Sequence, residues 1–115
     1  MIYTSYFANW RNFPEGSYAV GVVRFAPEWW RGPNLIMLAP SENLLRQFKN
    51  KEIDEFIFKQ KYLRELEERK LRAEDIKIVL NSIHRDIILC CYETPEEFCH
   101  RHILAEWLGG VKELS

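Results

Sequence analysis

The sequence feature that most constrains the fold is a short, almost wholly apolar run near the carboxyl terminus, residues 87–92 (IILCCY). Its composition indicates a β-strand. Because the run offers no polar face to water, we expect the strand to lie at the centre of a sheet rather than at an edge.

Two earlier segments also read as strands. Residues 2–8 are rich in β-branched and aromatic side chains, and residues 18–25 (YAVGVVRF) are almost continuously apolar. Continuous apolar character is typical of strands in a parallel sheet that helices cover. A short third strand is expected over residues 34–38, after an irregular loop rich in proline and tryptophan.

Helical patterns fill the middle and the end of the chain. Ser41 is a suitable N-cap for the first of them. A final helix is expected to begin near Pro95, because Thr94 and Glu97 have the spacing of a capping box. Three segments carry apolar residues at helical spacing between these two points: residues 42–50, 53–71 and 73–83.

This order of elements predicts an α/β fold with a small, mostly parallel sheet flanked by helices in two or three layers. A chain of 115 residues is expected to form a single domain, residues 1–115. The sequence leaves strand order open, and the second strand could pair antiparallel with the first.

The charge balance excludes some broad function classes. The 16 basic and 17 acidic side chains argue against bulk, sequence-independent binding of duplex DNA, although a local basic groove stays open. No apolar run approaches the roughly 20 residues needed to cross a bilayer, and the first residues lack a signal-peptide pattern. Three cysteines, two of them adjacent, do not suggest a disulfide framework, so a reduced cytoplasmic setting is expected.

Parallel strands would bring their polar carboxyl-terminal ends to one edge of the sheet, where open α/β sheets bind ligands. Aromatic walls with a few convergent polar groups are typical of small-molecule sites. The residues expected at this edge are Asn9, Trp10 and Arg11 from the first strand, Arg24 and Trp30 from the second, and Cys91, Glu93, His100 and Arg101 from the last.

The chemistry of these side chains points to an anionic ligand: a nucleotide, a nucleic-acid end or another phosphorylated metabolite. Arginines suit phosphate or carboxylate groups, and Trp10 and Trp30 could stack on a base. Glu93 is the first acid/base candidate, because a carboxyl at the end of an apolar strand can have its pKa raised. His100 is the second candidate, and no cofactor is expected.

Other readings of the same helix compete. Arg101 projects among apolar residues and needs a partner, which a purely structural network would supply from Glu93 or Glu106. A cysteine-dependent phosphatase is disfavoured, because nine residues separate Cys91 from Arg101 and the loop lacks glycine. Zinc binding is also disfavoured, because seven residues separate the two cysteines and the two histidines point to different sides of the helix. The zinc candidates would be Cys91, Cys99, His100 and His102.

A second function class is a non-catalytic interaction module. It would use exposed Trp29 and Trp30, together with the charged helix over residues 53–71, as surfaces for a protein partner.

Three stretches resemble the domain of unknown function family 488: YTSYFANWRNFP, RFAPEWW and LCCYETPEEFCHRHILAEWL. The last matches a strand–Cys–x–Glu signature followed by Cys-His-Arg, at Cys91, Glu93, Cys99, His100 and Arg101. The resemblance implies a compact α/β fold and a short bacterial or phage cytoplasmic protein, but it brings no reaction with it. Ser5-Tyr6-Phe7 stands where longer relatives have a Gly-His-Ser style turn, so no site role is implied for the first loop.

Overall fold

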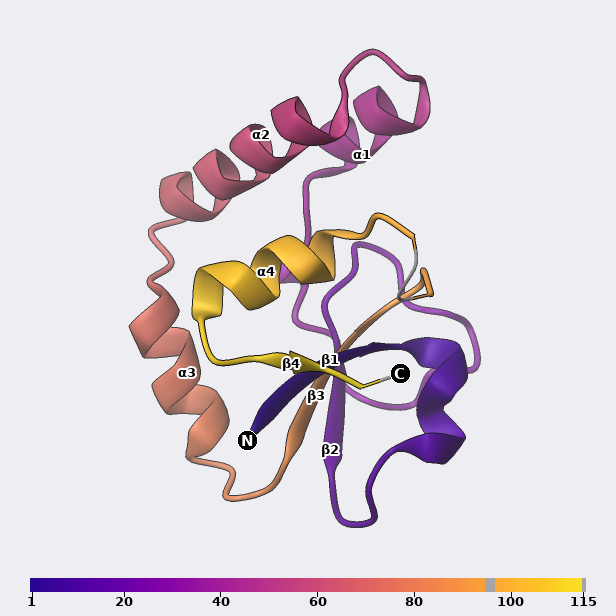
Figure 1. Ribbon diagram of the computed structural model, residues 1–115, viewed down its shortest axis with the longest axis vertical. Helices are drawn as coiled ribbons and strands as arrows, with labels where there is room; N and C mark the ends of the chain where they lie inside the picture. The colour runs from indigo at the N-terminus through magenta and orange to yellow at the C-terminus, as the bar shows by residue number, and fades with distance from the viewer. Residues whose placement is uncertain (95–96, 115) are drawn as a thin grey trace.

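The computed structural model describes residues 1–94 and 97–114 and confirms an α/β fold built on one sheet (Figure 1). The sheet has the order β2-β3-β1-β4, and every neighbouring pair is parallel. The strands are β1 (Ile2–Tyr6), β2 (Tyr18–Gly21), β3 (Ile87–Cys91) and β4 (Lys112–Glu113).

Strand β3 lies between β1 and β2, as its apolar sequence predicted. Ile87 pairs with Ile2 of β1 on one side and with Tyr18 of β2 on the other. All five residues of β3 are buried. Because β3 separates β1 from β2, the antiparallel alternative for these two strands is excluded.

Helices connect the strands. The predicted N-cap is confirmed, because the Ser41 hydroxyl accepts a hydrogen bond from the Leu44 amide at 3.1 Å. Among the described residues, no helix is both long enough and apolar enough to cross a membrane. The helical elements are the 3-10 turns η1 (Phe7–Asn12) and η2 (Ile36–Leu38), and the helices α1 (Glu42–Lys49), α2 (Glu55–Glu68), α3 (Ala73–Asn81) and α4 (His100–Leu108).

The predicted third strand over residues 34–38 is wrong. Asn34 forms only an isolated bridge with Gly21, and η2 follows. The Asn34 side chain donates to the Val23 carbonyl at 2.7 Å and accepts from the Val23 amide at 3.1 Å. A side-chain amide therefore satisfies backbone groups that a neighbouring strand would otherwise bond.

The predicted start of the last helix is also wrong. Helix α4 begins at His100 rather than near Pro95, and Cys99 before it is extended, with φ −147° and ψ 145°. Where a capping box was expected, the structure describes a backbone turn, in which the Glu97 amide donates to the Thr94 carbonyl at 3.1 Å. Pro95 itself lies outside the described residues. Cys99 lies beside Cys91 at the end of β3.

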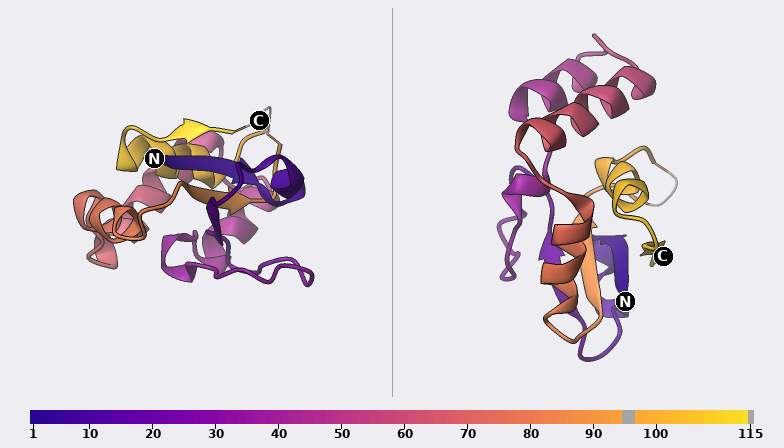
Figure 2. Two further views of the ribbon diagram at one scale, coloured as in Figure 1. Left: turned by 90° about the horizontal axis from the view of Figure 1, so that it is seen from below. Right: turned by 90° about the vertical axis from the view of Figure 1, so that its left-hand side faces the viewer.

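Among the described residues, helices α1 to α4 contribute to one of the two buried clusters. Ile87 and Leu89 of β3 pack with Leu80 of α3 and Leu104 of α4, whereas Ile88 lies in the other cluster. Phe7 of η1 and loop residues complete that second cluster. Helix α4 lies against the strands, while α1 and α2 form a hairpin at one end of the molecule (Figures 1 and 2). Of the two layered arrangements expected, the two-layer one is observed.

Strand β4 was not predicted, because its two residues carry no apolar pattern. Gly109 and Gly110 have φ of 79° and 73°, which a residue with a side chain rarely adopts, and they turn the chain back after α4. The chain then pairs with β1 through Tyr3 and Thr4. This edge strand brings Glu113 to the sheet.

We predict that Ile88→Ala lowers the free energy of unfolding by about 2–5 kcal/mol, because Ile88 is fully buried in the central strand. Ile78→Ala is the matched control, since Ile78 is 67% exposed and its truncation should change stability by less than about 0.5 kcal/mol. Urea denaturation of both variants checks this. Equal losses at the two positions would contradict the central placement of β3.

Candidate functional site

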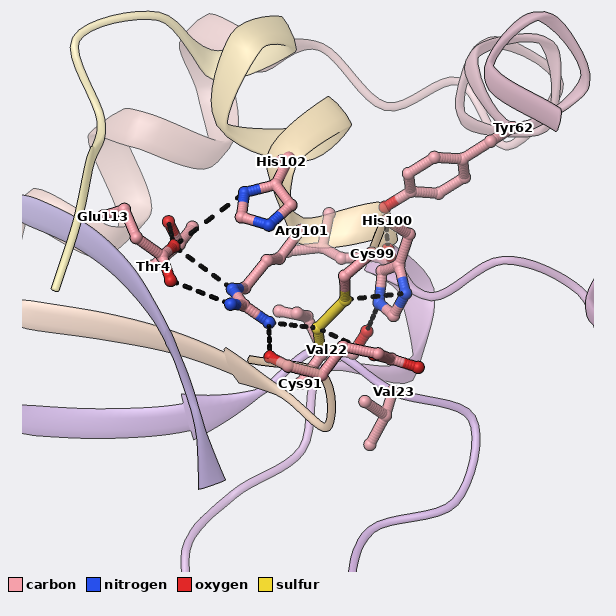
Figure 3. The surroundings of a disulfide bond; sticks show 12 residues. Thr4, Val22, Val23, Tyr62, Cys91, Cys99, His100, Arg101, His102 and Glu113 are labelled. Carbon is pink, nitrogen blue, oxygen red and sulfur yellow. Dashed lines mark hydrogen bonds and ion pairs between the residues drawn. A yellow bond between two sulfur atoms is a disulfide. The ribbon is translucent and has the colours of Figure 1, made fainter. Parts of the chain in front are cut away.

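Arg101, in the first turn of α4, is completely buried and donates to three different segments (Figure 3). Its Nε and Nη2 atoms donate to the two carboxylate oxygens of Glu113 at 3.1 and 2.8 Å. Its Nη1 atom donates to the Glu93 carbonyl at 2.5 Å and contacts the Cys91 sulfur at 3.2 Å. A forked ion pair with further hydrogen bonds is the arrangement that makes a buried guanidinium tolerable.

The carboxylate partner of Arg101 is Glu113, which differs from the expectation. Glu113 fills the place for which Glu93 or Glu106 was expected, and Glu106 pairs instead with Lys59 at the surface. Thr4 of β1 also donates to Glu113 at 2.7 Å. Because Arg101 does not reach solvent, its observed contacts favour the structural network, and its expected role in ligand binding stays a prediction.

Cys91 and Cys99 are joined by a disulfide. The expectation that the cysteines form no disulfide is therefore wrong for this pair. Cys90 is buried and free on the neighbouring position of β3. Burial raises the pKa of the Cys90 thiol to about 12, so this thiol is protonated at neutral pH.

His100 points away from Arg101, towards Val22 and Tyr62 (Figure 3). Its Nε2 atom lies 2.6 Å from the Val22 carbonyl, which can only accept, so Nε2 carries the proton. Its Nδ1 atom then presents a lone pair towards the Cys99 sulfur, 3.9 Å away. Burial lowers the pKa of His100 to about 4, so the ring is neutral at physiological pH.

A cavity of about 230 Å³ opens at the carboxyl-terminal ends of β2 and β3. The side chains of Arg24, Glu93 and His100 all line this cavity, which agrees with the prediction that the ends of parallel strands bring them to one edge of the sheet. A smaller cavity of about 60 Å³ shares Leu45, Glu93 and His100 and reaches Cys99. The larger cavity is lined by Val23, Arg24, Phe25, Leu45, Tyr92, Glu93 and His100.

Arg24 is the cationic group of this cavity. Its Nε and Nη2 atoms donate to the Pro40 carbonyl at 3.4 and 3.2 Å. Within residues 1–94 and 97–114, no carboxylate forms an ion pair with it. Arg24 therefore has no described ion-pair partner, although the carboxylate of Glu93 lines the same cavity.

The tryptophans lie in a second hollow rather than in this cavity. Trp10 and Trp30 line an apolar hollow of about 300 Å³, together with Trp29, Arg31 and Gly32. Arg11 lies over the Trp10 ring at 5.0 Å. The two hollows are connected through aromatic contacts, because the Phe7 ring packs against Trp30 at 4.9 Å and against Tyr92 at 5.3 Å.

Asn9 faces neither hollow. It is buried, and its amide donates to the Ser5 hydroxyl at 3.1 Å and to the Leu114 carbonyl at 3.4 Å. Its oxygen accepts from Asn12 at 2.7 Å. These bonds indicate that Asn9 fixes η1 against the end of β4, and a role in ligand binding stays a prediction.

Comparison with known proteins supplies the family. A family model described as the active DUF488-N3 subclade matches residues 9–111. The chain belongs to this DUF488-N3a family. No curated protein matches it, and no solved structure does. In this DUF488-N3a chain, the five positions that carry the resemblance at the carboxyl terminus (Cys91, Glu93, Cys99, His100 and Arg101) lie in one cluster.

We predict that the disulfide form of this DUF488-N3a chain loses stability below pH 6.5. Because the pKa of His100 is about 4 in the folded chain and about 6.5 in an unfolded one, only the unfolded state takes up this proton in that window. The free energy of unfolding should fall by about 2 kcal/mol between about pH 7 and pH 5. Urea denaturation at the two pH values measures the loss.

His100→Gln should remove most of that pH dependence, because glutamine can donate to Val22 but does not titrate. His84→Asn is the control, since His84 is exposed and its φ of 58° suits asparagine. The same pH slope in His100→Gln as in the native chain would show that another group is responsible.

Proposed function

We propose that this chain binds a small anionic ligand, a phosphorylated one above all, in the cavity lined by Arg24, Glu93 and His100. The observation that carries the proposal is the presence of Arg24, without a described carboxylate partner, beside two groups able to transfer protons. A cavity of about 230 Å³ has room for a compact group such as a phosphate.

The donor geometry of Arg24 supports phosphate as the anchor. Two of its five N–H groups donate to the Pro40 carbonyl, which leaves three for a ligand. That carbonyl also fixes the orientation of the guanidinium plane. A held guanidinium can meet two phosphate oxygens at once, which a flexible ammonium group does less well.

Glu93 and His100 supply the proton-transfer chemistry in this proposal. Glu93 lines both cavities, and its Oε2 atom lies 3.7 Å from the Cys91 sulfur. His100 is neutral and held by Val22, so it can accept a proton only at Nδ1. General acid–base transfer next to a bound phosphate is the reaction class that this arrangement favours.

The aromatic hollow favours a nucleotide or a nucleic-acid end among phosphorylated ligands. Tyr92 lines the Arg24 cavity, Phe7 packs on Tyr92, and Trp30 packs on Phe7. A ligand with its phosphate at Arg24 could therefore place a base on Trp10 or Trp30, where every base offers a face for stacking. Arg11, over Trp10, would supply a second charge there.

A non-catalytic interaction module is the second candidate. Trp29 is 51% exposed, as this candidate expects, whereas Trp30 is half-buried. Trp10, which is 48% exposed, extends the apolar surface, and such a surface favours a partner. In this case the tryptophans, rather than Arg24, would dominate binding, and the charged helix α2 would add to the surface.

We predict that adenosine 5′-monophosphate binds the native chain and that Arg24→Gln weakens this binding about tenfold or more, because a charged hydrogen bond contributes about 1.5–3 kcal/mol. Calorimetric titrations with the nucleotide, with adenosine and with inorganic phosphate measure the effect. Adenosine binding should be unaffected by Arg24→Gln.

Arg64→Gln is the matched control, because Arg64 is exposed on α2 away from the cavity. The proposal is wrong if none of the phosphorylated compounds binds, or if Arg24→Gln binds the nucleotide as tightly as Arg64→Gln does. Nucleotide binding that is lost in Trp10→Ala but kept in Arg24→Gln would show that the ligand binds in the tryptophan hollow without Arg24, which also contradicts the proposal.

A further inference from the structure

Two sulfur atoms and one imidazole nitrogen lie close together next to the smaller cavity, which Glu93, Cys99 and His100 line and which is called the Glu93 cavity below. The Sγ atoms of Cys91 and Cys99 and a ring nitrogen of His100 all lie within 4.8 Å of one another, and all three residues are buried (Figure 3). Thiolate and neutral imidazole are the ligands that zinc prefers in proteins.

The separations suit one metal ion. Zinc binds sulfur at about 2.3 Å and nitrogen at about 2.0–2.1 Å, so tetrahedral sulfur and nitrogen ligands lie roughly 3.6 Å apart. The Cys99 sulfur and His100 Nδ1 are already 3.9 Å apart. The remaining change is that the two sulfurs, bonded to each other in the disulfide form, separate to roughly 3.8 Å around the metal.

His100 is oriented as a metal ligand would be. Its Nε2–H group donates to the Val22 carbonyl at 2.6 Å, which leaves Nδ1 unprotonated and directed towards the sulfurs. Histidines that bind metals almost always hold the other ring N–H in this way. The carbonyl therefore fixes both the tautomer and the ring plane before any metal arrives.

Arg101 provides a hydrogen-bond donor next to the sulfurs. Its Nη1 atom lies 3.2 Å from the Cys91 sulfur, where it can donate to a metal-bound sulfur. Glu113 holds the guanidinium in place through the other side of its fork. The positive charge beside the sulfur is thus fixed rather than mobile.

We propose that, once the Cys91–Cys99 bond is reduced, Cys91, Cys99 and His100 bind one zinc ion whose fourth coordination position faces the Glu93 cavity. A dithiol reductant supplies the two electrons and two protons that convert the disulfide into two thiols, and is itself oxidised to a disulfide. Zinc then takes the place of the two thiol protons, which are released to solvent.

The fourth position gives the site its chemical class. Cys99, His100 and Glu93 line the same cavity of about 60 Å³, which joins the larger one through shared walls. Two cysteines, one histidine and an open position are a ligand set of catalytic rather than structural zinc sites. This inference does not depend on anion binding at Arg24; it uses His100 Nδ1 as a metal ligand in the reduced chain, so the proton transfer proposed at that atom applies to the disulfide form.

The structure also answers the two objections that the sequence raised against zinc. The seven-residue gap between the cysteines does not keep them apart, because the sulfur of Cys99, just before α4, lies beside the sulfur of Cys91 at the end of β3. His102 is not needed as a ligand, since its Nδ1 atom lies 4.0 Å from Glu113 on the other side of Arg101.

The test compares the full chain in its two redox states. One sample is reduced with dithiothreitol, another is left oxidised, and both are loaded with zinc and passed through an anaerobic gel-filtration column. Atomic emission should find about one zinc ion per reduced chain and none per oxidised chain. Cobalt in place of zinc should give a thiolate-to-metal charge-transfer band in the reduced sample alone.

Cys99→Ser should reduce bound zinc to background, and Cys90→Ser is the matched control that should retain it, because Cys90 lies outside the cluster. Circular dichroism confirms that each variant is folded, and the native chain in its two redox states decides the question if Cys99→Ser is not. The inference is overturned if the reduced native chain retains no zinc, or if Cys99→Ser retains as much as Cys90→Ser.

Discussion

The buried guanidinium of Arg101 is the interaction on which the carboxyl-terminal half of the molecule depends. It joins the first turn of α4 to the end of β3 through Glu93 and Cys91, and to edge strand β4 through Glu113. A charge with no solvent contact imposes a large cost unless each of these partners is in place. The same requirement therefore fixes where α4 begins, where β4 lies and where the sulfurs of the cluster sit.

This arrangement separates structural from chemical roles among neighbouring residues. Arg101 is directed towards Glu113 of the sheet, whereas His100 is directed towards Val22 and the two cavities. Adjacent residues of one helix therefore have different roles. Glu93 contributes twice, because its carbonyl accepts from Arg101 while its side chain lines both cavities. The proposed ligand site at Arg24 and the proposed metal site at the cysteines are therefore neighbours that share Glu93 and His100.

Much of the fold could be predicted from the sequence, because burial leaves a strong pattern. The apolar run of β3 predicted a central strand, Ser41 predicted the start of α1, and the strand ends correctly brought Arg24 to Glu93 and His100. Such features depend on local composition and on the geometry of a parallel sheet.

The parts that could not be predicted depend on contacts between distant residues. Glu113 belongs to a strand of two residues with no apolar pattern. The sequence signal for its role is indirect: Arg101 projects among apolar residues and therefore requires an acidic partner. Asn34 replaces a strand by side-chain bonds that no periodicity reveals. The tryptophans line a hollow of their own, and their link to the Arg24 cavity runs through the packing of Phe7 on Trp30 and Tyr92, a contact between distant segments.

A double-mutant cycle across Arg101 and Glu113 tests the central claim most directly. Arg101→Met, Glu113→Gln and the double variant are compared with the native chain by urea denaturation, and the coupling energy isolates the pair. The account predicts a favourable coupling of about 1–3 kcal/mol, because the guanidinium is fully buried and its fork engages both carboxylate oxygens. A coupling near zero would mean that the two side chains stabilise the sheet edge independently, which contradicts the account.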